Sequence, residues 1–157
     1  MVDQTIKDIR AHFAPLVGER IIRYETAELL LTDGSWSDWP DLPIRIYTDG
    51  GKLISLSWSR IDDPWIADDL SLPFSIEDST VRWISNGIDK INPAVGATIR
   101  SVMLGQGGMS IEGREVEIWT RLLIQIDDRW LAIFNAGDEN GYGFHADWPP
   151  GECVMCV

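Results

Sequence analysis

A run of alternating side chains at 116–126 constrains the fold more than any other feature of the sequence. Its even positions hold Val116, Ile118, Thr120, Leu122, Ile124 and Ile126, and its odd positions hold Glu117, Trp119, Arg121, Leu123 and Gln125. Alternation with a period of two is typical of a β-strand that buries one face. Asp127-Asp128 then favours a turn, and a second apolar run follows at 129–135. We therefore expect an antiparallel hairpin over 116–135.

A second hairpin is predicted in the first half of the chain. Ile44 and Ile46 alternate with polar neighbours, and after the turn sequence Thr-Asp-Gly-Gly the same pattern resumes at Ile54, Leu56 and Trp58. Short Asp/Gly connections are typical of hairpins. Weaker strand patterns occur at 20–24, 28–32, 81–85 and 97–104.

The N-terminal segment has the helical period instead. Its apolar stripe consists of Val2, Ile6, Ile9, Phe13 and Leu16, and Pro15 and Gly18 favour an end to the helix. Strand and helix patterns do not alternate along the chain. The sequence therefore predicts an α+β fold in which an N-terminal amphipathic helix packs on a mainly antiparallel, curved β-sheet built of hairpins. No repeat or linker indicates a boundary, so we expect one domain over 1–157.

Net charge limits the classes of partner. The chain has 13 Lys and Arg against 25 Asp and Glu, which gives a formal charge of −12. Nucleic acids and anionic membranes both attract Lys and Arg, so we expect neither as a direct partner. No apolar run approaches the roughly 18 residues of a membrane span, and the N-terminus lacks the apolar region of a signal peptide. We therefore expect a cytoplasmic protein, with its oligomeric state open.

The negative charge is concentrated in two parts of the chain. Residues 25–78 carry a net −9 and residues 124–157 a net −5, and four of the eight tryptophans lie among these acids. Trp is a frequent interface residue, and a surface of one sign speeds association with a partner of the other sign. The alternative is that these loops only solvate the fold and their tryptophans cover core edges. The candidate partner-binding residues are Trp36, Asp38, Trp39, Asp62, Asp63, Trp65, Asp68, Asp69, Asp138 and Glu139.

Residues that could perform catalysis are few. Cys153 and Cys156 have the spacing of a redox or zinc pair, but a zinc site needs two more ligands and neither histidine stands in a ligand pair. His145 is near Asp147, which could orient it as a general base, but no nucleophile stands in a recognisable motif. We therefore expect a non-enzymatic protein with no catalytic residue and no cofactor.

Two further motifs favour turns over ligand sites. The acidic segment 138–141 lacks the alternate spacing of a common calcium loop, so we expect no metal there. The glycines at 105–108 lack both the third glycine of a dinucleotide site and the Lys-Ser/Thr of a phosphate loop. We expect them to form a flexible hairpin loop.

The segment VEIWTRLLIQIDDRWLAIFNAGDE, residues 116–139, together with small size and acidity, resembles the immunity proteins of bacterial polymorphic-toxin and contact-dependent systems. The likeness covers this hairpin and, more loosely, the Asp-Gly-Gly hairpin near residue 50. It implies a protein that binds one cognate toxin, often a basic nuclease, and blocks its active site. Acidic loops would mimic phosphate and steer association, and tryptophans would anchor the interface.

A small-molecule or peptide-binding module is the alternative function. In that case a curved sheet would form a pocket lined by Trp58, Trp83, Trp119 and Trp130. The positions of the tryptophans separate the two hypotheses. An enclosed cavity containing several of them favours a ligand, whereas an exposed acidic surface that carries them favours a protein partner.

Overall fold

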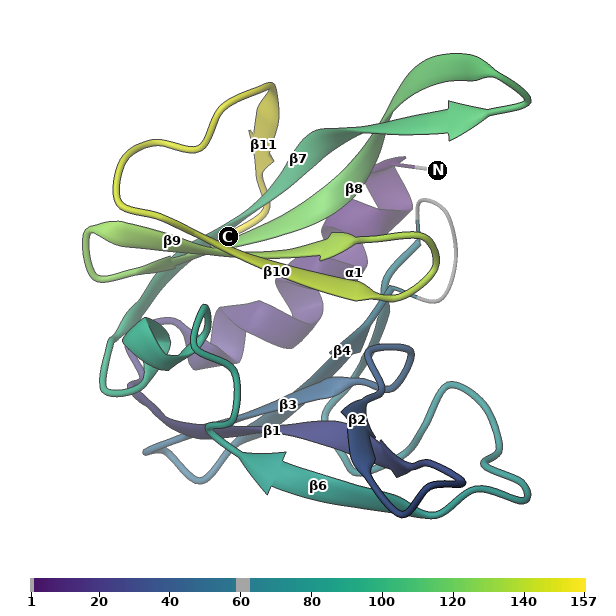
Figure 1. The fold of residues 1–157 in the computed structure, drawn as a ribbon. Coiled ribbons are helices and arrows are strands. Elements are labelled where there is room, and N and C mark those ends of the chain that lie inside the picture. Colours follow the sequence, from purple (N-terminus) through teal and green to yellow (C-terminus); the bar gives the residue numbers. More distant parts are fainter. Residues whose placement is uncertain (1, 59–62) are drawn as a thin grey trace.

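The computed structural model describes residues 2–58 and 63–157, and it has the expected α+β architecture (Figure 1). The first sheet contains β1 (Ile21–Leu30), β2 (Trp36–Asp38), β3 (Ile44–Thr48), β4 (Leu53–Ser57), β5 (Trp65–Ala67) and β6 (Val81–Ser85). The second contains β7 (Ile99–Ile111), β8 (Arg114–Ile126), β9 (Arg129–Asn135), β10 (Asn140–His145) and β11 (Cys153–Met155). Every strand pairing within each sheet is antiparallel.

The N-terminal helix fills the space between the sheets. Helix α1 (Val2–Phe13) continues into a short 3-10 turn, η1 (Ala14–Leu16). Its apolar stripe is buried at Ile9, Phe13 and Leu16, whereas Val2 is exposed at the first residue of the helix. Figure 1 shows α1 crossing between the two sheets, so one core includes side chains of the helix and of both sheets. Among the described residues, no helix is long and apolar enough to cross a membrane.

The first sheet follows the order β2-β1-β3-β4-β5, with β6 on the other edge of β1. The two strands predicted at 20–24 and 28–32 form one strand, because the residues between them also pair. Glu25 lies opposite Arg45 of β3 and Ser85 of β6, so its polar side chain does not interrupt the strand. The predicted hairpin at 44–58 is confirmed as β3 and β4.

The second sheet follows the order β10-β9-β8-β7-β11. Its centre is the hairpin predicted from 116–135, which is confirmed as β8 and β9. The glycines at 105–108 were expected in a loop, and that expectation is wrong because they lie inside β7. A Cβ at Gly107 would collide with the Thr120 hydroxyl of β8. Glycine at this position therefore allows β7 and β8 to pack closely. The turn comes later, where Glu112 and Gly113 both have positive φ.

Both faces of the second sheet are covered. Leu122, Ile124 and Leu131 face the core shared with α1, and the opposite face carries a smaller cluster of Met103, Leu123, Trp130 and Ala132. The connection at 146–152 joins β10 to β11, which lie at opposite edges of the sheet (Figure 1, yellow). Trp148 in this connection meets Trp130 edge to face at 5.3 Å between ring centroids.

Candidate functional site

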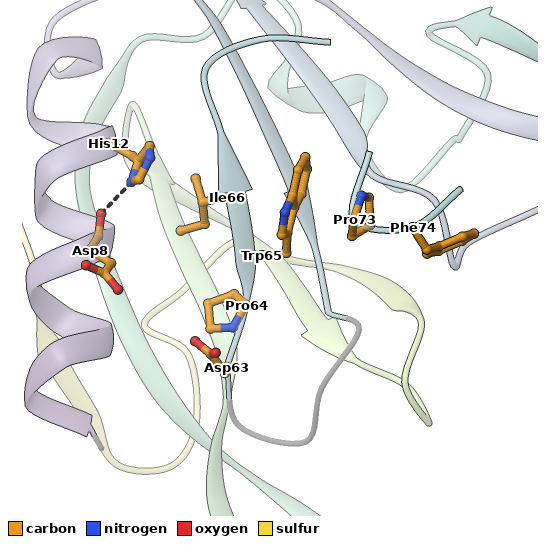
Figure 2. Close-up of a pocket in the computed structure, with 8 residues that line it drawn as sticks. All are labelled: Asp8, His12, Asp63, Pro64, Trp65, Ile66, Pro73 and Phe74. Carbon is orange, nitrogen blue, oxygen red and sulfur yellow. Dashed lines mark hydrogen bonds between the residues drawn. The ribbon is translucent and has the colours of Figure 1, made fainter. Parts of the chain in front are cut away.

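A groove of about 530 Å³ opens on the surface beside β5 (Figure 2). Three parts of the chain line it: α1, the segment entering and forming β5, and the loop between β5 and β6. Its lining residues are Asp8, His12, Asp63, Pro64, Trp65, Ile66, Pro73 and Phe74. In Figure 2, Asp8 and His12 lie on the helix side, Trp65 lies in the middle, and Pro73 and Phe74 lie on the opposite side.

Strand β5 positions the central side chains of this groove. It is a three-residue strand at the end of the first sheet, and it pairs with β4 through Ser57–Trp65 and Ser55–Ala67. Because neighbouring side chains on a strand point to opposite faces, Ile66 packs against the core while Trp65 stays half-buried on the outer side. The strand therefore presents an indole to the surface from a fixed backbone.

The helix side of the groove is polar. The exposed Asp8 carboxylate accepts a hydrogen bond from the Gln4 amide at 2.8 Å, one helical turn away. His12 Nδ1 donates to the Asp8 carbonyl oxygen at 2.8 Å, which holds the imidazole along the helix. Asp63, in the segment that enters β5, also lines the groove and is exposed.

Trp39 extends the aromatic part of the surface beyond the groove. Its ring lies 6.1 Å from that of Phe74, centroid to centroid, with the planes tilted by 58°. Trp39 follows β2, Trp65 lies in β5 and Phe74 lies in the loop after β5, so three separate segments contribute to one surface. We call Trp39, Trp65 and Phe74, together with Asp8 and Asp63, the acidic aromatic face.

A second hollow, of about 250 Å³, lies between the two sheets, and Trp39 is part of its wall. Asp38, Trp39 and Lys90 line it together with Asn140 and Tyr142 of β10. Burial raises the pKa of Tyr142 far above its usual value, so its hydroxyl keeps its proton and can donate a hydrogen bond. This hollow is smaller than the groove and combines apolar walls with a few polar groups.

Only some of the predicted partner-binding residues lie together in the structure. Asp63, Trp65 and Trp39 belong to the acidic aromatic face, and Asp38 lines the neighbouring hollow. Asp138 and Glu139 form the β9–β10 turn, which is tied to the segment after Trp39 by the Asn140 N–H to Pro40 carbonyl bond of 2.9 Å.

Other predicted residues have local partners. The Arg82 guanidinium lies 4.1 Å above the Trp36 ring and pairs with Glu28 at 2.8 Å. Asp68 lines a separate hollow with Lys52 near the end of α1. The Asp69 carboxylate accepts hydrogen bonds from the Ser71 hydroxyl and N–H, which lower its pKa. Asp62 lies outside the described residues.

Sequence reasoning missed Asp8, His12, Pro73 and Phe74. Phe74 had a signal, because Leu-Pro-Phe at 72–74 is an apolar cluster in a polar loop and the Phe74 side chain is 38% exposed. The sequence gives no such signal for Asp8, because charged residues are expected on the polar face of any amphipathic helix. Only the packing of α1 beside β5 makes it part of the groove.

The residues considered for chemistry lie elsewhere. Cys153 pairs with Gly105 at the edge of the second sheet, and Cys156 is buried in the main core. Burial raises the pKa of Cys156 to about 11, which keeps the thiol neutral and weakly nucleophilic near neutral pH. Over residues 2–58 and 63–157, no group of three or more His, Cys, Asp and Glu side chains could hold a metal ion.

The four tryptophans of the alternative hypothesis do not share a cavity. Trp58 is fully buried in the core and its indole donates to the Ile133 carbonyl at 2.9 Å. Trp130 is buried on the outer face of the second sheet, and Arg45 covers Trp83 at 3.5 Å. Trp119 packs at the edge of the core. None of them lines the groove or the hollow between the sheets.

No family model, curated protein sequence or solved structure matches this chain.

Proposed function

We propose that this protein is a non-enzymatic inhibitor of the immunity type, which binds and neutralises a basic cognate toxin through the acidic aromatic face. The observation that carries the proposal is the gathering of Trp39, Trp65 and Phe74 from three segments onto one surface beside exposed carboxylates. Partly exposed aromatic side chains such as these three are typical anchors of protein interfaces.

Charge around this face supports a basic partner. Residues 31–43 and 63–79, which supply most of the face, contain three and five acids and no Lys or Arg. A cationic protein approaching these segments would meet a net negative charge, which raises the association rate more than it lowers the dissociation rate. The same charge disfavours an anionic partner.

The test uses the protein encoded by the neighbouring reading frame in the source genome. We expect it to be basic and to bind this chain. We expect Asp8→Lys and Asp63→Lys to slow association about tenfold at 20 mM salt, and much less at 500 mM, because salt screens charges beyond roughly 10 Å at 0.1 M. Surface plasmon resonance at several salt concentrations would measure both rates.

Asp128→Lys is the control for this experiment. Asp128 is exposed in the β8–β9 turn, outside the groove, and its reversal changes net charge by the same amount. Equal slowing by all three variants would mean that only total charge matters, and the acidic aromatic face would then not be the contact surface. Absence of binding by the neighbouring protein would contradict the immunity function itself.

The hollow between the sheets supports a second candidate, a small-ligand module. Its apolar walls and the protonated Tyr142 hydroxyl are features of ligand pockets. Thermal-shift screening would separate the candidates, because a small ligand in this hollow would raise the melting temperature in the wild type and not in a Tyr142→Phe variant.

A further inference from the structure

Thr26 of β1 contributes a hydroxyl to the hollow between the two sheets. The residue is only 7% exposed and lines the hollow. Its hydroxyl has no hydrogen-bond partner among the described residues. In the same part of the chain, Arg45 Nε is the one unpartnered side-chain nitrogen or oxygen that is also closed off from solvent. The Thr26 hydroxyl is therefore open to the hollow that the residue lines.

Tyr142 of β10 lines the same hollow from the second sheet. Thr26 lies two residues from Tyr24, which is buried in the main core, so both of these side chains point toward the second sheet. Tyr142 packs against that core from the opposite side. Its hydroxyl accepts a hydrogen bond from the Asn140 side-chain amide at 3.3 Å, and within the described chain its hydrogen has no acceptor. Burial raises the pKa of Tyr142, so this hydrogen is retained near neutral pH.

The Asn140 amide is not left for a ligand, although it also lines the hollow. Its oxygen accepts from the Trp58 backbone N–H, and its nitrogen donates to the Leu56 carbonyl and the Tyr142 hydroxyl. The polar groups inside the hollow that can still bind a ligand are therefore the two hydroxyls. Each can donate a hydrogen bond, which a carbonyl oxygen accepts.

The opening and the walls of the hollow limit the ligand further. Asp38 and Lys90 are exposed lining residues of opposite charge, so together they favour a ligand without net charge. The apolar walls are formed by Trp39, Pro40, Leu42 and Ile88. The volume of about 250 Å³ is below the roughly 300–1,000 Å³ of pockets for drug-sized ligands, which favours a molecule with a single ring.

We propose that the hollow binds an uncharged single-ring compound whose carbonyl oxygen accepts a hydrogen bond from the Thr26 hydroxyl, with its ring against the apolar walls. The inference rests on the second candidate function, the small-ligand module, and names its class of ligand. Thr26 is the donor because its hydroxyl has no partner within the described residues, whereas the Tyr142 hydroxyl already has Asn140. A ligand that lacked an acceptor would displace water and leave the Thr26 hydroxyl unpaired.

Acetophenone is the probe, and ethylbenzene, which has a similar shape and no oxygen, is the matched ligand. Binding would be followed by the backbone amide signals of Ala27 and Gly141, both in the lining, in nitrogen-edited NMR spectra. We expect acetophenone to bind the wild type with a dissociation constant on the order of 1 mM. Ethylbenzene shows how much of that binding comes from the apolar walls alone.

Variants at Thr26 then isolate the hydrogen bond. Thr26→Val keeps the shape of the side chain and should weaken acetophenone binding about fivefold without weakening ethylbenzene binding. Thr26→Ser keeps the hydroxyl and should bind acetophenone within about twofold of the wild type. The matched control is Thr120→Val, at a buried threonine of β8 outside the hollow, which should change neither ligand.

Three results would overturn the inference. One is the absence of amide shifts in the hollow at 10 mM acetophenone. Another is equal binding of acetophenone by Thr26→Val and the wild type. The third is equal weakening by Thr26→Val and Thr26→Ser, because the methyl group would then matter rather than the hydroxyl. If screening finds a ligand that Tyr142→Phe loses and Thr26→Val binds as tightly as the wild type, this inference fails and the small-ligand function stands.

Discussion

At the scale of single residues, Asn140 shows how a polar side chain joins the two sheets across an apolar core. It is 3% exposed and begins β10 of the second sheet. Its side-chain oxygen accepts a hydrogen bond from the backbone N–H of Trp58 at 2.9 Å. Its side-chain amide donates a hydrogen bond to the Leu56 carbonyl at 3.0 Å. The sequence Asp-Glu-Asn-Gly indicates a turn, and the turn does lie there, but the turn pattern gives no sign of these long-range bonds.

We predict that Asn140→Ala lowers the free energy of unfolding by about 2–4 kcal/mol, because it leaves a buried N–H and a buried carbonyl without partners. Urea denaturation followed by tryptophan fluorescence would measure the change. Ser37→Ala, at an exposed position of β2, is the control and should stay within about 0.5 kcal/mol of wild type. A loss below about 1 kcal/mol would show that water replaces these bonds without cost.

At the scale of elements, the segment 146–152 covers the outer face of the second sheet. Arg121 of β8 holds it by donating from Nη2 to the Pro150 carbonyl at 2.7 Å, while its Nε donates to the Gln106 carbonyl. The segment leads into β11, which pairs with Met103–Gly105 of β7. One guanidinium therefore joins the central strand, its neighbour and the connection that brings the C-terminus to the sheet edge.

We predict that Arg121→Met loosens this segment and the β11–β7 pairing while the sheet centre stays protected. Hydrogen exchange measured by mass spectrometry should show faster exchange in 151–156 and unchanged exchange in 122–124 and 131–133. Arg100→Met, at an exposed position of β7, is the control and should leave both regions unchanged. Uniform acceleration over the whole sheet would instead indicate that Arg121 contributes to global stability.

The strands differ in how visible they are in the sequence. Strands β8 and β9 carry long apolar alternation and were predicted, because each buries a face of its own. Strands β2, β5 and β11 have three residues each, too few for a period to emerge. In β10, Gly-Tyr-Gly-Phe-His resembles a loop, and a Cβ at Gly141 would collide with the Phe134 ring of β9. These strands form because each pairs with a neighbouring strand of at least five residues.

At the scale of the whole molecule, the burial of acidic groups and the net negative charge both lower the stability of the folded chain at high pH. Burial raises the pKa of five acidic groups that are neutral near pH 7, namely Tyr24, Tyr47, Tyr142, Cys153 and Cys156. The folded chain therefore keeps protons that the unfolded chain releases. Ionisation would also add negative charge to a chain that already carries −12.

We predict that the free energy of unfolding falls as the pH rises above about 9. The unfolded thiol of Cys156 loses its proton near its usual pKa of 9.0, whereas the folded thiol keeps it to about 11. Stability linked to this group is therefore present below pH 9 and lost between 9 and 11. Urea denaturation under reducing conditions at pH 8, 9, 10 and 10.5 should show the decline.

Cys156→Ser should make this decline shallower between pH 9 and 11, because the serine hydroxyl does not ionise there. The comparison uses the slope against pH, since the variant also changes the packing of the core at every pH. A stability that stays constant from pH 8 to 10.5 would contradict the prediction for all five groups.

The sequence by itself determined the α+β class, the amphipathic helix, the two main hairpins and the excess of acid. These follow from periodicity and composition, which are properties of neighbouring residues. Only the tertiary structure decided that Asp8 of α1, Trp65 of β5 and Phe74 of the following loop line one groove, while Trp36 lies under Arg82. The reason is that exposed side chains have no period of their own, so where they meet depends on how buried faces pack beneath them.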